Sequence, residues 1–210
     1  PTRRTSDLER LLNFLKREIE NVELKKEKKA LENKLFHSYD IIGKSQSIEK
    51  VKKLIAKLKN AESRIFISGP AGSGKELVAR QIHKQSTRSK KPFVVVNGAL
   101  LDPQKYELEL FGSENLNDTT NFGFFEKAKD GTVLIDEVTE IPLETQAKIL
   151  RVLIDQKFRR VNGSKEINVN VRIISTSSKN IREEVDKGNF REDLYHRLNV
   201  VPIFLQPLKD

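Results

Sequence analysis

The stretch Gly69-Pro-Ala-Gly72-Ser-Gly74-Lys75 decides the fold of this chain, because it stands between a predicted strand at 64–68 and a predicted helix at 75–84. A glycine-rich loop in that position, ending in lysine, is typical of a phosphate-binding loop. Glycines let successive backbone N–H groups point at one anion, and the helix start adds partial positive charge. The lysine adds a full charge. The alternative is a glycine-rich turn with a chance lysine.

Short apolar runs surround this loop and alternate with amphipathic stretches. The runs predict buried strands at 64–68, 93–97, 132–136, 171–176 and 200–204, and the amphipathic stretches predict helices at 47–58, 75–84, 106–111, 122–129, 143–155, 181–187 and 191–198. This alternation predicts an α/β fold, a doubly wound parallel sheet with flanking helices on both faces. Asn162-Gly163, between 158–161 and 167–171, predicts a hairpin closed by a tight turn.

Two acids, Asp136 and Glu137, follow the predicted strand at 132–136. In metal-assisted phosphoryl transfer one acid holds Mg²⁺ and the other polarises the attacking water. Asp136 is therefore the candidate magnesium ligand and Glu137 the candidate base, although a helix cap also explains two acids at this place. Asn97 ends another predicted strand, where its side chain either bonds one of these acids or caps a turn.

Two arginines, Arg191 and Arg197, lie six residues apart in a predicted helix and therefore on different faces of it. A surface arginine that reaches the nucleotide of a neighbouring chain stabilises charge on the transferring phosphate. Salt bridges with Glu192 and Asp193 are the alternative.

The N-terminal residues form a separate segment, predicted as a long linker helix at 1–37 before the α/β domain at 38–210. Leu8, Leu12, Leu15, Ile19 and Val22 are spaced as in a coiled-coil seam. Two interpretations stay open: a helix that pairs with another chain, and an amphipathic helix that lies on its own domain.

Composition narrows the class of protein. The 210 residues carry a net charge of +9 and no cysteine, which excludes disulfides and thiolate chemistry. Three scattered histidines have no metal-ligand spacing. No apolar run has the length of a membrane span or resembles a secretory signal, so we expect a cytoplasmic protein without membrane contact. Because the sequence starts at Pro1, we expect a fragment.

Residues from Ile41 onward resemble the central ATPase domain of bacterial sigma-54-type transcription activators, a branch of the AAA+ ATPases. The likeness rests on blocks in the family's order, at 68–80, 93–97, 109–112, 131–137, 142–153 and 190–198. The family also has glutamate after the loop lysine, so Glu76 fits this branch although most phosphate-binding loops have Ser or Thr there.

The resemblance implies ATP and Mg²⁺ as ligands. It places Ile42 and Gly43 near the adenine and Asp136 on Mg²⁺, makes Glu137 the residue that activates water, and makes Asn97 the residue that restrains Glu137 until a ring has formed. Arg191 and Arg197 would face the ATP of the adjacent subunit. The residues implied around the phosphates are Gly69, Pro70, Ala71, Gly72, Ser73, Gly74, Lys75, Glu76 and Leu77.

The resemblance also implies partners. It predicts a homo-oligomer, as a dimer through the linker helix or as an ATPase ring, within a two-component response regulator. The receiver domain that a sensor kinase acts on, the helical lid and the DNA-binding domain are expected outside residues 1–210. RNA polymerase is a further expected partner.

Two departures from the family bear on function. The motif Gly-Ala-Phe-Thr-Gly-Ala, which contacts the sigma factor, is absent from residues 113–122, and Ser177-Ser178 replaces the Thr-Asn nucleotide sensor. The first hypothesis is therefore an ATP-binding module that hydrolyses ATP to ADP when assembled, with doubtful contact to sigma-54. The alternative is a nucleotide-responsive oligomerisation module that positions DNA-binding domains without hydrolysis. Direct DNA binding by this stretch, allowed by its charge, is a weaker third hypothesis.

Overall fold

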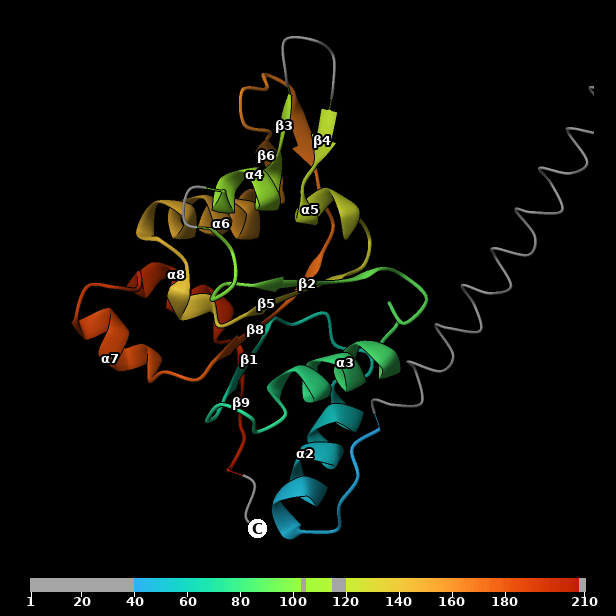
Figure 1. Cartoon of the computed structure of the whole chain (residues 1–210). Coiled ribbons are helices and arrows are strands. Elements are labelled where there is room, and N and C mark those ends of the chain that lie inside the picture. The colour runs from blue at the N-terminus through green and yellow to red at the C-terminus, as the bar shows by residue number, and fades with distance from the viewer. Residues whose placement is uncertain (1–39, 103–104, 115–119, 208–210) are drawn as a thin grey trace, which may run out of the picture. The chain divides into compact units, whose positions relative to one another are not determined.

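The computed structural model describes residues 40–102, 105–114 and 120–207 (Figure 1). By its internal contacts the chain divides into Pro1–Asp40 and Ile41–Asp210. The linker helix predicted at 1–37, and with it the choice between pairing and lying on its own domain, falls outside the described residues. Among the described helices, none has the length and apolar character that a membrane span requires.

The second unit is built on a five-stranded sheet in the order β2-β5-β8-β1-β9. Every pairing in it is parallel, which confirms the predicted doubly wound fold. Its strands are β1 (Ile65–Ser68), β2 (Phe93–Asn97), β5 (Thr132–Asp136), β8 (Arg172–Ser177) and β9 (Val201–Phe204). The register pairs Asn97 with Asp136 and Ser68 with Ser177, so the strands end together at one edge.

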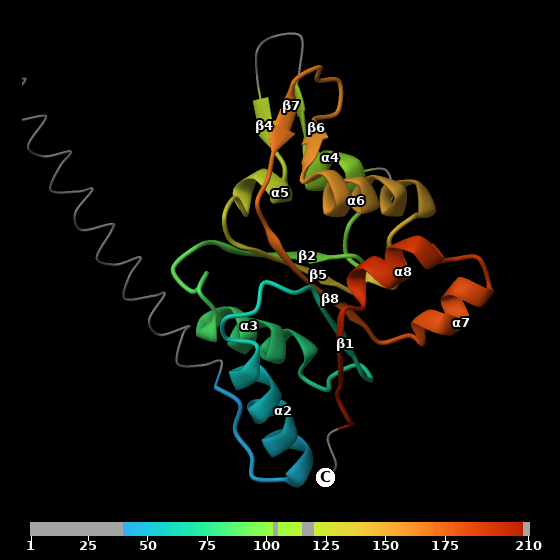
Figure 2. The same cartoon turned by 180° about the vertical axis from the view of Figure 1, so that it is seen from behind.

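Helices cover both faces of this sheet (Figures 1 and 2). One face carries α2 (Gln46–Lys57) and α3 (Lys75–Gln85). The other carries α4 (Tyr106–Phe111), α5 (Phe124–Lys127) and α6 (Leu143–Asp155), and α7 (Ile181–Asp186) and α8 (Glu192–Leu198) follow β8. A short 3-10 helix, η1 (Val138–Glu140), follows β5.

The core consists of two apolar clusters, one on each face of the sheet. Neighbouring strand residues point to opposite faces, so Phe66 packs toward α4 to α6 whereas Ile65 and Ile67 pack toward α2 and α3. Val133 and Leu134 on β5 divide in the same way. Burial on both faces explains why these strands appear in the sequence as continuous apolar runs.

Two antiparallel hairpins project together from the domain (Figures 1 and 2). One pairs β3 (Gly112–Glu114) with β4 (Thr120–Phe122), and the sequence did not predict it. The prediction of a helix at 122–129 is wrong at both ends, because Phe122 lies on β4 and α5 is only Phe124–Lys127.

The second hairpin, β6 (Lys157–Arg159) with β7 (Glu166–Asn168), was predicted with too short a connection. Val161 donates its N–H to Gly112 O (3.0 Å) and accepts the N–H of Glu114 (3.1 Å). Residues 160–161 therefore pair with the neighbouring hairpin and cannot extend β6 toward a tight turn at Asn162-Gly163.

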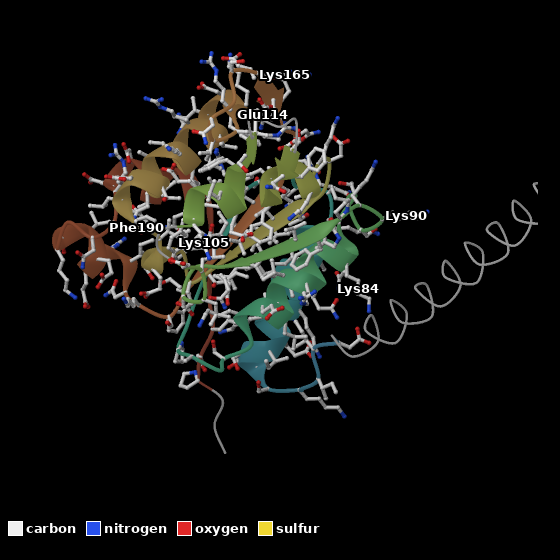
Figure 3. All side chains as sticks on the ribbon, turned by 45° about the horizontal axis from the view of Figure 1, so that its top comes forward. Lys84, Lys90, Lys105, Glu114, Lys165 and Phe190 are labelled. Carbon is white, nitrogen blue, oxygen red and sulfur yellow. The ribbon has the colours of Figure 1, made fainter. Side chains whose placement is uncertain are left out.

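Arg160 joins the two hairpins to α5. Its Nη2 and Nε donate to Glu126 at 2.6 and 2.8 Å, and its Nη1 donates to Glu114 at 2.6 Å. The hydrogen bonds to Glu126 are the main reason that the pKa of Arg160 is raised. Its guanidinium also lies 5.4 Å from the centre of the Phe122 ring. Glu114 lies at the hairpin end of the molecule in Figure 3, as does Lys165.

We expect Arg160→Ala to lower the free energy of unfolding by about 3–5 kcal/mol, because the half-buried carboxylates of Glu114 and Glu126 would lose their counter-charge. The matched control is Arg159→Ala, which removes an exposed arginine paired with Glu166 at 3.1 Å. It should cost less than about 1 kcal/mol. Urea denaturation of both variants measures the difference, and equal losses would contradict the linking role of Arg160.

His83 is a buried histidine on α3. Its Nδ1 lies 2.9 Å from Thr132 Oγ1, and its ring lies 5.0 Å from the ring of Phe93. Burial is the main cause that lowers the pKa of His83 to about 4, and the charges of Arg172 and Arg80 lower it further. The folded chain therefore holds a neutral imidazole at neutral pH.

This histidine should make stability depend on pH. Between pH 6.5 and about 4 the unfolded chain takes up a proton at His83 that the folded chain does not. The free energy of unfolding therefore decreases as the pH is lowered through this range, by up to about 3 kcal/mol. His83→Asn keeps a polar atom near Thr132 but does not titrate. As the pH is lowered from 6.5 to about 4, the urea midpoint should fall more steeply for the wild type than for His83→Asn. Parallel pH dependences of the two midpoints would contradict the lowered pKa of His83.

Candidate functional site

The loop between β1 and α3 has the backbone that an anion-binding loop needs. Gly72 and Gly74 have φ of +77° and +84°, where residues with a side chain are strained. No side chain caps α3, and its first internal bond runs from the Val78 N–H to Gly74 O (3.0 Å). The N–H groups at the start of α3 therefore have no helical acceptor and are open to an anion.

Lys75 lies inside this loop with only 7% of its surface exposed. Its ammonium donates to Gly69 O (3.0 Å) and Pro70 O (3.1 Å), and it lies 3.3 Å from Glu137 Oε1. The structure thus brings together the two residues that the sequence singled out from different motifs, because β1 and β5 flank β8 and end at the same edge.

The carboxylate of Asp136 is held by two side chains. Thr176 donates its hydroxyl to Asp136 Oδ1 (2.5 Å), and Asn97 donates its amide to Oδ2 (3.2 Å). Asn97 therefore bonds one of the two acids, as one of the two alternatives from the sequence had it, whereas its restraint of Glu137 stays a prediction. Asn97 stands beside Asp136 in the β2–β5 register, so its amide reaches Asp136.

Glu137 has a left-handed backbone, with φ 51° and ψ 55°, which is uncommon for a residue with a side chain. Its N–H donates to Thr176 Oγ1 (3.0 Å), and its Oε2 accepts both the N–H and the hydroxyl of Ser178 at 2.8 Å. Burial alone would raise the pKa of Glu137, but the bonds from Ser178 and the charge of Lys75 outweigh it, so the pKa lies below its ordinary value. Glu137 is therefore ionised at neutral pH.

The glutamate that follows the loop lysine does not join this group. Glu76 lies on the surface of α3, where it accepts a hydrogen bond from Arg80 Nε at 2.8 Å and forms an ion pair with Arg80 Nη2 at 2.6 Å. Its charge is thus balanced within the helix, away from the ammonium of Lys75. Leu77 lies on the same first turn, and its predicted contact with a nucleotide stays a prediction.

Arg191 and Arg197 are both exposed at opposite ends of α8. Arg191 forms a two-bond pair with Asp193 at 2.7 and 3.0 Å, which is the surface salt bridge weighed from the sequence. Within the described residues Arg197 has no ion-pair partner. Neither arginine joins the cluster of Lys75 and Glu137 in its own chain, and a contact of Arg191 with a neighbour would have to replace its pair with Asp193.

Gln146 fixes the segment that leads to Arg191. It is fully buried on α6, donates to Ile141 O (2.7 Å) and Asn189 O (3.0 Å), and accepts the Arg191 N–H (2.9 Å). Sequence reasoning missed Gln146, because a glutamine in an amphipathic helix gives no sign of being buried. It also missed Thr176, whose position inside an apolar strand hid its contacts with the two acids.

A cleft of about 630 Å³ opens beside the loop. Gly69 and Pro70 form one wall and residues 178–182 another, with Tyr195 and Phe204 completing it. Phe204 exposes 69% of its surface, so its ring is accessible to a flat ligand. The sequence singled out neither ring.

The predicted adenine contacts, Ile42 and Gly43, do not line this cleft. Ile42 is 93% exposed, whereas Gly43 accepts a hydrogen bond from Lys52 Nζ (2.8 Å). The neighbouring Ile41 is partly buried and packs against the apolar cluster to which α2 and α3 contribute. The structure therefore anchors this segment and leaves the Ile42 side chain in the open, and its contact with adenine stays a prediction.

Among the residues that the structure describes, no three His, Asp or Glu side chains gather as a metal site. The predicted contact of Asp136 with Mg²⁺ stays a prediction, and further ligands would have to come from phosphate oxygens or water, as Mg²⁺ commonly accepts. The Oγ of Ser73, in the phosphate loop, is buried without a hydrogen-bond partner in the described part of the chain.

Comparison with known proteins identifies one family and relatives that cover most of this chain. Residues 41–204 match the protein family described as "Sigma-54 interaction domain". The nitrogen assimilation regulatory protein NtrX of Azorhizobium caulinodans is 42% identical over 203 residues, which cover 96% of this chain and 44% of that protein. The chain thus spans less than half the length of this relative.

Solved structures agree with this match. A crystal structure of NtrX from Brucella abortus has a TM-score of 0.84 at 44% identity, covering 94% of this chain and 44% of that one. A second, of the same protein in complex with ATP, has a TM-score of 0.81 at 44% identity and covers 95% and 45%. From the matched residues, the shared fold and these relatives, the chain belongs to the sigma-54 interaction domain family.

Proposed function

We propose that this chain is the ATP-binding module of a two-component transcription regulator, and that it hydrolyses ATP to ADP and phosphate when several chains assemble. The observation that carries the proposal is the meeting of Lys75 and Glu137 at 3.3 Å, at the edge where the parallel strands end. Ligands of open parallel sheets bind at that edge. The relative from Brucella abortus has been crystallised with ATP and with ADP, which supports the same ligand here.

The described residues fit a triphosphate. The unpaired N–H groups at the start of α3 and the unpartnered hydroxyl of Ser73 supply donors, and Lys75 supplies charge. Asp136 would hold Mg²⁺ together with phosphate oxygens, and the ion would neutralise negative charge on them.

Hydrolysis requires a group that accepts the proton of the attacking water. In the reaction a water oxygen bonds to the γ-phosphorus, the bond from that phosphorus to the β–γ bridging oxygen breaks, and ADP leaves with the electron pair. Glu137, ionised and next to Lys75, would take the proton of the water. Thr176 would keep the two acids in their relative positions.

Assembly would complete the site. Arg191 and Arg197 are exposed and do not reach the acids of their own chain, so we propose that they act on the nucleotide of a neighbouring chain. The buried Gln146 would hold the segment of Arg191 in place for that contact. A homo-oligomer is therefore part of the proposal.

The remaining partners are proposed from the family alone. DNA, RNA polymerase and a sensor kinase would act through parts of a longer regulator working in the cytoplasm. Contact with sigma-54 is the weakest of these proposals, because residues 113–122 lack the sequence Gly-Ala-Phe-Thr-Gly-Ala.

A second function is favoured by the same ion pair. Glu137 is occupied by Lys75 and Ser178, which keeps its carboxylate from a water molecule. A chain that binds ATP without leaving this arrangement would change its oligomeric state and would not turn ATP over. Light scattering with ATP, alongside measurement of ADP formed, separates the two functions.

Lys75→Ala should weaken ATP binding at least about 100-fold, since it removes the only full positive charge in the loop. Lys90→Ala removes an exposed lysine beyond α3 (Figure 3) and should leave affinity unchanged. Glu137→Gln should still bind ATP but form no ADP. Calorimetric titration with ATP and Mg²⁺ measures the affinity of all three variants, and the ADP formed measures turnover. No heat with the wild type would overturn the proposal.

Arg191→Ala should bind ATP normally and lose turnover by about 10³-fold, because its guanidinium acts on a neighbour's ATP. The wild-type rate should rise more steeply than protein concentration. Arg151→Ala, which removes another exposed arginine on α6, is the control. A rate strictly proportional to concentration and indifferent to Arg191→Ala would remove the shared-site mechanism.

A further inference from the structure

We propose that Ser178 is a positioning residue that holds Glu137 against Lys75, so that ATP and Glu137 compete for the same ammonium. The inference rests on the proposed function, since it concerns how the same site admits its ligand. It differs from the expectation carried by the family, in which Asn97 restrains the glutamate.

The geometry assigns this role to Ser178. Glu137 Oε2 accepts the Ser178 N–H and the Ser178 hydroxyl, each at 2.8 Å. Glu137 Oε1 faces Lys75 Nζ at 3.3 Å. Within the described residues no other side chain bonds this carboxylate, so Ser178 and Lys75 alone determine where it points.

The ammonium of Lys75 is fully used in this arrangement. It has three protons to donate, and its partners are Gly69 O, Pro70 O and Glu137 Oε1, at 3.0, 3.1 and 3.3 Å. A phosphate oxygen can bond the ammonium only by replacing one of them. Glu137, which would repel the phosphate, is the partner most readily displaced.

The backbone of Glu137 is held separately from its carboxylate. Thr176 accepts the Glu137 N–H and bonds Asp136, so the left-handed backbone does not depend on Ser178. Another nearby cation, Lys179, is paired with Glu140 at 2.7 Å. Loss of the Ser178 hydroxyl should therefore weaken the hold on the carboxylate alone, leaving the Ser178 N–H as its remaining donor from that residue.

The test compares Ser178→Ala with Ser178→Thr, which keeps a hydroxyl. Ser177→Ala is the matched control, because the hydroxyl of Ser177 bonds Lys179 and Thr139 and does not touch Glu137. The first readout needs no nucleotide. The carbon-13 chemical shift of the Glu137 carboxyl at neutral pH should change in Ser178→Ala and keep its wild-type value in Ser178→Thr and Ser177→Ala.

The second readout is ATP affinity by calorimetry. Ser178→Ala should bind ATP about tenfold more tightly, as expected when one hydrogen bond to a charged group is lost from the competing pair. Glu137→Gln should also bind more tightly. Adding Ser178→Ala to Glu137→Gln should then change affinity no further, because both act through one pair.

The outcomes separate this inference from the proposed function. An unchanged chemical shift of the Glu137 carboxyl in Ser178→Ala overturns the positioning role, whether or not ATP binds. Absence of ATP binding in every variant, with the change in chemical shift present, overturns the proposed function and the competition while retaining the contact. Additive gains in the double variant would show that Ser178 acts on ATP directly and would also overturn the inference.

Discussion

The position of β8 between β1 and β5 is the constraint on which the site depends. Parallel pairing in register makes Ser68, Asp136 and Ser177 end at one edge, so the loop after β1 and the acids after β5 share one small volume. The residues that follow β8 enter the same volume from between them. Three segments distant in the sequence therefore build one polar cluster at the end of the sheet. The two faces of that sheet are each covered by an apolar cluster.

Charge within this cluster is balanced by the chain itself. Lys75 is nearly buried and has Glu137 as its counter-charge, and Asp136 is held by neutral donors from Thr176 and Asn97. A buried ammonium is costly unless it is paired. The pair therefore stabilises the loop, and the same contact controls what a phosphate ligand has to displace.

The two hairpins are held by different interactions from those that hold the parallel sheet. Phe158 on β6 packs on the rings of Phe111 and Phe125, and Arg160 and the backbone of Val161 link the two hairpins. Two-stranded hairpins are marginally stable alone. The ion pairs to Glu114 and Glu126 give these hairpins a common anchor on α5, apart from the nucleotide edge.

The sequence by itself determined the five strands of the parallel sheet and most helices, because continuous apolar runs and helical periodicity are local signals that burial on both faces of a sheet imposes. It also determined the phosphate loop, Asp136 and Glu137, since glycine spacing and terminal acids are local as well. Only the tertiary structure decided the β3–β4 hairpin, the partner of Asn97, and the roles of Thr176, Gln146 and Ser178. Those depend on which strands become neighbours and in what register, and no single segment contains that information.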